Sequence, residues 1–258
     1  MSVHSILPPA LTEAVEGVLR DAGTTHVAHG DRDHLAAASA IVRDPEARAV
    51  IGPYRSRAVA EVVEVTAPAG VPLLAPVATW SGVTRDDEPG CDDHPARHRG
   101  TVLRLVARDT VVAQRIADRV RGGGQRAVVV AGDHDYGTQL DAQLAVAGLP
   151  RASATGDADV VVLAGLVGKP ELDAARALAP LPILAFDGIQ GEAFPGQEVE
   201  LVLVYAHGPV GVAEARRAAE LVSATTDLAE LRRLGRFDEH GDPLDPVVRF
   251  ERYDTDRG

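Results

Sequence analysis

The chain has 258 residues, of which 45% are apolar, and this content is sufficient for a globular protein with a hydrophobic core. Its formal net charge of −12 at pH 7 repels nucleic-acid phosphates and anionic lipids, and the sequence offers no basic patch to offset it. We therefore expect a small molecule or another protein as partner, and neither nucleic acid nor a membrane surface. The single cysteine, Cys91, excludes a disulfide within the chain.

Short runs of Val, Ile, Leu and Ala recur along the chain, and each is ended by Gly, Pro or Asp. Continuous apolar runs of this kind are typical of parallel strands that helices cover on both faces. Strands are expected at 49–51, 71–74, 127–130, 160–163, 183–185 and 201–204.

Between these runs, apolar residues recur three and four positions apart, which is the spacing of a helix that buries one face. Helices are expected at 57–69, 109–121, 137–147, 170–178 and 212–224. The first of them is rich in β-branched valine and is the least favoured by intrinsic helix propensity. The alternation of strands and helices predicts the α/β class.

A polar, turn-forming stretch at 85–100 interrupts this alternation, and we expect the chain to cross between two lobes just after it. The tail, 236–253, contains a turn at Gly241-Asp242 and then an alternating strand, which we expect to pack as a late antiparallel addition or crossover. The predicted N-terminal lobe comprises 1–102 plus 204–235, and the predicted C-terminal lobe comprises 103–203 plus 236–258.

The sequence contains no stretch of about 18 apolar residues, so we expect no membrane-spanning helix. Residues 1–17 have neither a basic start nor a long apolar run, so they do not resemble a secretory signal. The chain as given is expected to be cytoplasmic unless a leader has been removed.

Ligands of doubly wound sheets bind outside the carboxyl ends of the strands. Aromatic residues form only 3% of the sequence, yet four of them, Tyr54, Trp80, Tyr136 and Phe186, follow predicted strands. They are suited to line a binding cleft, although aromatic residues also stabilise ordinary loops. Ser56 begins a predicted helix, where a hydroxyl and free backbone N–H groups could hold a carboxylate or where the serine could be a plain helix cap. With Thr79, two hydroxyls could face one anion.

At these residues the sequence resembles the leucine/isoleucine/valine-binding receptors, which have the type I periplasmic binding protein fold. The most specific segment is AVIGPYRSRAVAEVVEVTAPAGVPLLAPVAT, residues 49–79, and further resemblance lies in 103–120, 127–137, 158–165, 181–188 and 237–246. The resemblance implies two doubly wound parallel-sheet lobes joined by a hinge that close on a ligand. It also implies that Ser56, Val77 and Thr79 bind the ligand carboxylate and that Tyr136 contacts the ligand from the second lobe.

The resemblance is incomplete at the second lobe. Receptors of this family usually carry an acidic residue for the ligand ammonium after the strand that matches 160–163. Here Lys169 stands near that position, with Glu171 two residues later, so both are expected to influence selectivity and an amino-acid ligand is disfavoured. The expected ligand-binding residues are Tyr54, Ser56, Val77, Thr79, Trp80, Tyr136 and Asp187.

Two other chemistries are less well supported. The histidines and acids of HVAHGDRDH, residues 26–34, match no closed zinc pattern, and we expect no metal and no cofactor. Asp133, His134 and Asp187 could act as acid–base groups, but no nucleophile or metal accompanies them. We therefore expect a non-enzyme.

The sequence favours a solute-binding component of an ABC transporter that captures a small polar or carboxylate-bearing, amino-acid-like metabolite between the lobes. The expected partners are that ligand and a transporter permease. The alternative is a cytoplasmic ligand sensor on the same fold that regulates a partner protein, and a small α/β enzyme is a more distant third. The family is normally extracytoplasmic, so the localisation depends on the native start of the gene.

Overall fold

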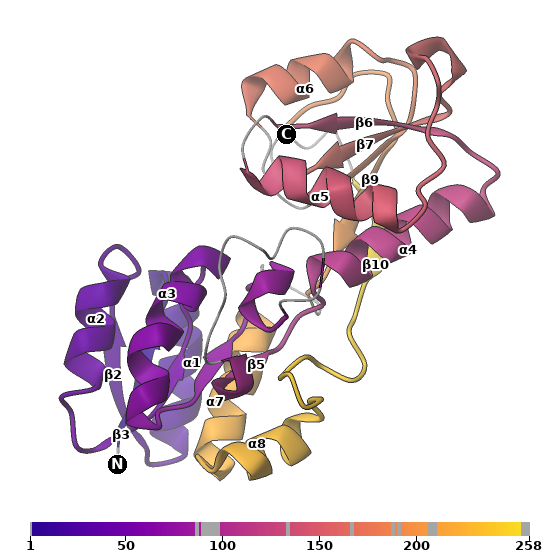
Figure 1. The fold of residues 1–258 in the computed structure, drawn as a ribbon. Helices are drawn as coiled ribbons and strands as arrows, with labels where there is room; N and C mark the ends of the chain where they lie inside the picture. Colours follow the sequence, from indigo (N-terminus) through magenta and orange to yellow (C-terminus); the bar gives the residue numbers. More distant parts are fainter. Residues whose placement is uncertain are drawn as a thin grey trace. The chain divides into compact units, whose positions relative to one another are not determined.

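A computed structural model describes residues 2–85, 88, 99–132, 135–165, 168–186, 189, 192–205 and 211–253. The chain forms two compact units, the first comprising Met1–Arg108 and Tyr205–Val247 and the second comprising Asp109–Val204 and Val248–Gly258 (Figure 1). The chain therefore passes between the units three times. No helix among the described residues is both long and apolar enough to cross a membrane.

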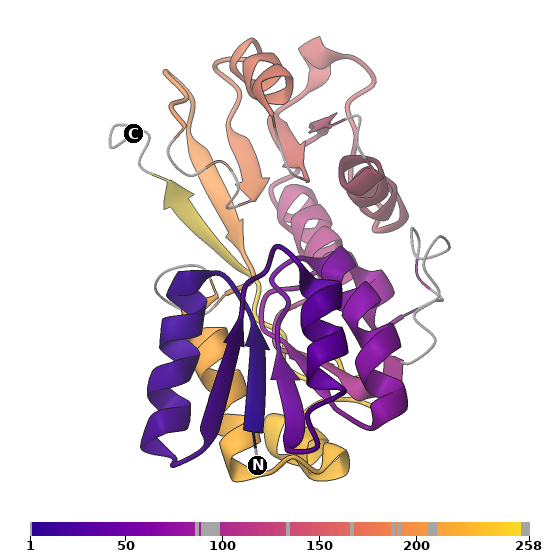
Figure 2. The same ribbon diagram turned by 90° about the vertical axis from the view of Figure 1, so that its left-hand side faces the viewer.

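The first unit is built on a five-stranded sheet in the order β2-β1-β3-β4-β5, with all neighbouring strands parallel. Helices lie on both sides of it (Figure 2). One core joins the sheet to α2 and α3, and another joins its opposite face to α1, α7 and α8. The elements are β1 (Ser2–Ile6), α1 (Pro9–Asp21), β2 (Thr25–His29), α2 (His34–Ile41), β3 (Ala47–Ile51), α3 (Ser56–Thr66), β4 (Leu73–Ala75), β5 (Val102–Arg104), α7 (Val212–Ala224) and α8 (Leu228–Gly235).

The second unit has a sheet in the order β10-β9-β8-β7-β6, in which only β10 runs antiparallel to its neighbour. A core of alternate residues from β7, β8 and β9 packs against α6. The tail therefore ends in the antiparallel strand that its alternation predicts. The elements are α4 (Asp109–Gly122), β6 (Ala127–Ala131), α5 (Asp135–Val146), β7 (Val160–Ala164), α6 (Lys169–Arg176), β8 (Ile183–Phe186), β9 (Val199–Leu203) and β10 (Arg249–Tyr253).

The predicted α/β class with two doubly wound, mainly parallel sheets is confirmed. Helix α3 forms despite its β-branched residues, because Val59, Val62 and Val63 are fully buried against the sheet and packing outweighs intrinsic propensity. Helices α1, α2 and α8 were not among the expected elements.

The boundary between the units differs from the predicted division at the first crossing and in the tail. Residues 103–108 and 236–247, expected in the C-terminal lobe, belong to the first unit. The physical reason is that Asp242 is bonded to buried groups of the first sheet's edge and that Phe237 lies in the first unit's core. Only the last segment, Val248–Gly258, joins the second unit.

Candidate functional site

The carboxyl edge of the first sheet brings together the loops that follow β3 and β4. The chain leaves β3 through Gly52, which has a φ of +102°, and a Cβ there would lie 2.4 Å from the carbonyl oxygen of Ile6. Only glycine allows this close approach to β1. The turn delivers Ser56 to the first position of α3.

Ser56 contacts the loop after β4 directly. The backbone N–H of Trp80 donates a hydrogen bond to Ser56 Oγ, with 3.3 Å between nitrogen and oxygen. This bond occupies a lone pair of the hydroxyl, so the hydroxyl proton can still be donated to another acceptor. The two loops that the sequence singled out for carboxylate binding therefore meet at Ser56.

The N-terminus of α3 is electrostatically suited to an anion. No side chain caps it, and its first turn contains no acidic residue. The first backbone N–H groups of a helix have no partner within the helix, and they carry the positive end of its dipole. Ser56, at the first position, stands where an anion would meet those groups.

The predicted residues of these two loops differ in exposure. Tyr54 is 36% exposed, whereas Val77 and Trp80 are only 5% and 7% exposed. The Trp80 side chain packs in the core with α2 and α3, and its backbone N–H makes the contact with Ser56. Val77 contacts Gly211, where a Cβ would lie 2.3 Å from the Val77 Cγ1.

A hollow of about 310 Å³ opens beside this region, between the ends of β2 and β3. Its polar walls include Arg32, Arg55 and Arg57. The Glu61 carboxylate in the same hollow is paired with His34 at 2.6 Å and lies 3.6 Å from the Arg57 guanidinium. Arg57 therefore offsets the Glu61 charge, and among the other charged groups of the hollow Arg32 and Arg55 outnumber Asp31.

In the second unit, Tyr136 is positioned by its own neighbours. Its hydroxyl donates to a carboxylate oxygen of Asp109 at 3.1 Å, and Asp109 is almost fully buried at the start of α4. The next residue, Gly137, lies against Gly165, where a Cβ would be 2.9 Å from the Gly137 Cα. The start of α5 is thus held closely against the end of β7.

The predicted selectivity residues bond locally. The Lys169 ammonium contacts the Asp173 carboxylate at 2.6 Å, one turn along α6, and its side chain is 84% exposed. Glu171 accepts a hydrogen bond from the backbone N–H of Gly168 at 2.7 Å, which caps the same helix. Both side chains stabilise the start of α6. Asp187, Asp133 and His134 lie outside the described residues.

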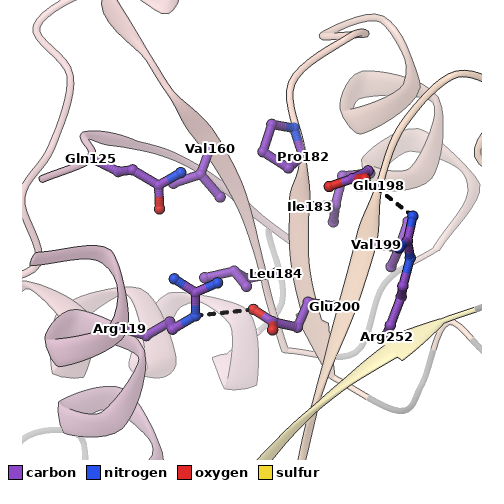
Figure 3. Close-up of a pocket in the computed structure, with 10 residues that line it drawn as sticks. All are labelled: Arg119, Gln125, Val160, Pro182, Ile183, Leu184, Glu198, Val199, Glu200 and Arg252. Carbon is purple, nitrogen blue, oxygen red and sulfur yellow. Dashed lines mark hydrogen bonds and ion pairs between the residues drawn. The ribbon is translucent and has the colours of Figure 1, made fainter. Parts of the chain in front are cut away.

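A second hollow, of about 230 Å³, lies in the second unit and is lined by residues from the beginning of β7, β8 and β9 (Figure 3). Its charged walls are paired: Arg119 with Glu200 at 3.2 Å and Arg252 with Glu198 at 3.1 Å. Because it lies toward the amino ends of these strands and its arginines have partners, it is the weaker candidate.

The histidines considered as metal ligands have separate partners. His26 contacts the Ser5 hydroxyl, His29 contacts His4 and His34 contacts Glu61. No group of three or more His, Cys, Asp or Glu residues in the described part of the chain could hold a metal ion.

Sequence reasoning missed Arg104 and Asp242. Both are buried, and they bond to each other across 138 positions of sequence, behind the loop after β4. The turn at Gly241-Asp242 was predicted, but its docking on β5 was not. The available signal was an arginine at the end of an apolar strand, which requires a buried counter-ion.

A scan of protein-family models finds no match for this sequence, and a search of curated proteins finds none either. Solved structures do match. An ABC transporter substrate-binding protein from Desulfitobacterium hafniense in complex with Leu aligns over 98% of this chain and 97% of its own, with 18% identity and a TM-score of 0.74.

Two further neighbours resemble the chain in the same way. The branched-chain amino acid transporter substrate-binding protein LivJ from Streptococcus pneumoniae, in complex with isoleucine, aligns over 98% of this chain and 99% of its own, with 14% identity and a TM-score of 0.68. A solute-binding protein from R. palustris in complex with benzoate aligns over 96% and 91%, with 14% identity and a TM-score of 0.69. These neighbours are described as binding proteins. The chain therefore has the fold of the ABC transporter substrate-binding proteins that the resemblance implied, the type I periplasmic binding protein fold.

Proposed function

We propose that this protein binds a small metabolite through a carboxylate group at the carboxyl edge of its first sheet, as the solute-binding component of an ABC transporter. The observation that carries the proposal is the contact between Ser56 Oγ and the backbone N–H of Trp80. It joins the uncapped start of α3 to the loop that contains Thr79. Two hydroxyls and the first N–H groups of a helix are a suitable set of donors for one carboxylate.

The hollow beside this site supports an anionic ligand. Arg32 and Arg55 contribute two guanidinium groups against the one carboxylate of Asp31, while Glu61 is already paired with Arg57. Tyr54, which also lines the hollow, is exposed enough to cover an apolar part of the ligand. Tyr136 and Asp187 remain proposed contacts from the second unit. Delivery of the ligand to a permease is proposed because the structural neighbours are substrate-binding proteins of ABC transporters.

The pairing of Lys169 with Asp173 changes the expected ligand class. An ammonium on the ligand would be repelled only if Lys169 faced it, and in the structure Lys169 bonds along its own helix. Amino acids and other carboxylates are therefore both candidates. Leucine, isoleucine and benzoate are suitable probes because the neighbours carry them.

The test is calorimetry and thermal unfolding with these three acids and with leucinamide and benzamide as matched amides. A bound acid at 100 times its Kd should stabilise the protein by about 2.7 kcal/mol, whereas the matched amides, which lack the carboxylate, should not. The double variant Ser56→Ala/Thr79→Val should weaken binding by about 1.5 to 3 kcal/mol for each charge-assisted hydrogen bond lost, with a normal melting curve.

Ser39→Ala is the control, since it removes a half-buried hydroxyl from α2, away from both loops. Unchanged affinity in the double variant would contradict the assignment of the site to Ser56 and Thr79. Equal binding of acids and amides would show that the ligand is not recognised through a carboxylate.

A further inference from the structure

Arg104 is fully buried at the end of β5, and its guanidinium faces the back of the loop after β4. Nη1 donates to the carbonyl oxygens of Ala78 at 3.0 Å and Trp80 at 2.9 Å. Nη2 donates to the Thr84 hydroxyl at 2.6 Å and lies 3.4 Å from the Ser81 carbonyl. The donors of the guanidinium are thus directed mainly at one short stretch of backbone.

The counter-ion of Arg104 comes from the tail of the chain. Asp242 accepts from Arg104 Nε at 3.1 Å, from the Thr84 hydroxyl at 2.7 Å and from Arg85 Nε at 2.8 Å. Burial alone would raise the pKa of the Asp242 carboxyl, but the Arg104 charge and the hydrogen bonds from Thr84 and Arg85 hold that pKa below its usual value. The carboxylate therefore stays charged beside the arginine.

A tight turn docks Asp242 on the sheet. The backbone N–H of Arg104 donates to the Gly241 carbonyl at 2.8 Å, and Asp238 accepts from the backbone N–H of Asp242 at 3.0 Å. Gly241 has a φ of +91°, and a Cβ there would lie 1.9 Å from the Val102 carbonyl oxygen. Only glycine fits between the turn and β5.

Thr79 lies between two anchored carbonyls, those of Ala78 and Trp80. The same Trp80 residue uses its N–H to contact Ser56 Oγ. The loop is therefore held through its carbonyls by Arg104 and through an N–H by Ser56. We propose that Arg104 and Asp242 are positioning residues that fix the shape of the 78–81 loop for ligand binding, an inference that rests on the proposed function for its ligand.

The proposal requires arginine and not only a positive charge. Arginine has five N–H donors in a rigid planar fork, whereas lysine has three donors on one nitrogen. A lysine at position 104 could pair with Asp242 or reach one carbonyl, but it could not hold the carbonyls of Ala78 and Trp80 together with the Thr84 hydroxyl. Arg104→Lys therefore keeps the charge and loses the geometry.

Trp80 is the only tryptophan of the chain, so fluorescence excited at wavelengths where tyrosine does not absorb reports on this loop alone. In Arg104→Lys we expect the Trp80 emission to shift to the red. Amide exchange at 78–84 should rise about tenfold relative to the exchange of β1 and β3. A tenfold rise corresponds to the loss of about one hydrogen bond. Acrylamide quenching of Trp80 should increase as well. Arg233→Lys is the matched control, because it alters an exposed arginine that pairs with Glu230 on α8.

A second variant covers the case in which Arg104→Lys does not fold. Arg104→Met/Asp242→Leu replaces the buried ion pair with apolar side chains, a change that proteins often tolerate. It should restore folding and still leave the loop carbonyls without their donor. Wild-type quenching and exchange of the loop in a folded variant of either kind would overturn the proposal.

Ligand binding is measured separately, with leucine and benzoate as probes. The positioning role predicts that whichever probe binds the wild type binds the folded variants about tenfold more weakly, and Arg233→Lys equally well. If neither probe binds the wild type, the proposed function loses support, while the fluorescence and exchange results still decide whether Arg104 holds the loop.

Discussion

The loop after β4 in the first unit and the segment after β7 in the second unit are held in different ways. In the first unit, the loop after β4 depends on Arg104 and Asp242, which lie 138 positions apart. In the second unit, Lys169 and Glu171 bond within the first turns of their own helix. A loop held by distant residues has a defined shape only when the whole unit is folded, whereas local contacts tolerate substitution. We therefore expect changes at the first edge to have the larger effects.

The largest effect is expected for Asp242→Ala, because it leaves the guanidinium of the fully buried Arg104 without its counter-ion. The free energy of unfolding should fall by about 3 to 5 kcal/mol. Urea unfolding, followed by circular dichroism and by Trp80 fluorescence, measures this loss.

The control on the same tail is Asp245→Ala, since Asp245 pairs with Arg236 and both side chains are about 70% exposed. An exposed pair of this kind contributes at most about 1 kcal/mol. Equal destabilisation by the two variants would contradict the importance assigned to the buried pair.

A smaller effect is expected in the second unit from Tyr136→Phe, which removes the hydrogen bond to the buried Asp109. The free energy of unfolding should decrease by about 0.5 to 1.5 kcal/mol. A double-mutant cycle with Asp109→Ala, which removes the acceptor, isolates the contribution of this bond. An unchanged stability would mean that this hydrogen bond contributes nothing measurable to the fold.

Much of the fold could be predicted because its signals are local. The apolar runs at 49–51, 127–130 and 160–163 fall within β3, β6 and β7, since buried parallel strands must be apolar on both faces. Helices α1 and α2 lie in the N-terminal region, where the sequence pattern predicted no helix. The alternation of the tail also predicted β10 correctly.

The candidate site was less predictable because its geometry depends on long-range contacts. The contact between Ser56 and Trp80 follows from the general rule that the carboxyl ends of neighbouring strands converge. The burial of the Trp80 ring, the pairing of Lys169 and the docking of Asp242 do not follow from any local pattern. Each is decided by which partner the folded chain brings within reach.

Acidification should also act unequally on the two units. Burial lowers the pKa of His26 and of His29 and the nearby His4 lowers both further, while the Glu16 charge opposes part of the pKa shift at His26. The folded state therefore binds fewer protons than the unfolded state below the ordinary histidine pKa of about 6.5, and stability is lost as the pH falls through that range. Among the described residues, all histidines belong to the first unit.

We expect the first unit to become less stable relative to the second between about pH 7.5 and about pH 5.5, on either side of that pKa. Hydrogen exchange of β1 and β2, compared with that of β6 and β7 and corrected for intrinsic rates, measures this difference in stability between the units. The double variant His26→Gln/His29→Gln should reduce the pH-dependent difference. Equal responses of the two sheets in the wild type would contradict the role of these histidines.

The smallest effect is expected at Lys169. Its ion pair with Asp173 is exposed and spans one helical turn, so Lys169→Ala should change the free energy of unfolding by no more than about 0.5 kcal/mol. If the ammonium bonds along α6 as the structure has it, removing it should also leave the affinity for leucine and for benzoate unchanged. Calorimetry of both probes tests this, with Asp173→Ala as the reciprocal variant, because it releases the lysine. Tighter leucine binding by about tenfold in Lys169→Ala alone, an effect of about 1.4 kcal/mol, would mean that Lys169 does oppose an ammonium on the ligand. Both edges would then contribute charged side chains to ligand recognition, which the local contacts of Lys169 do not indicate.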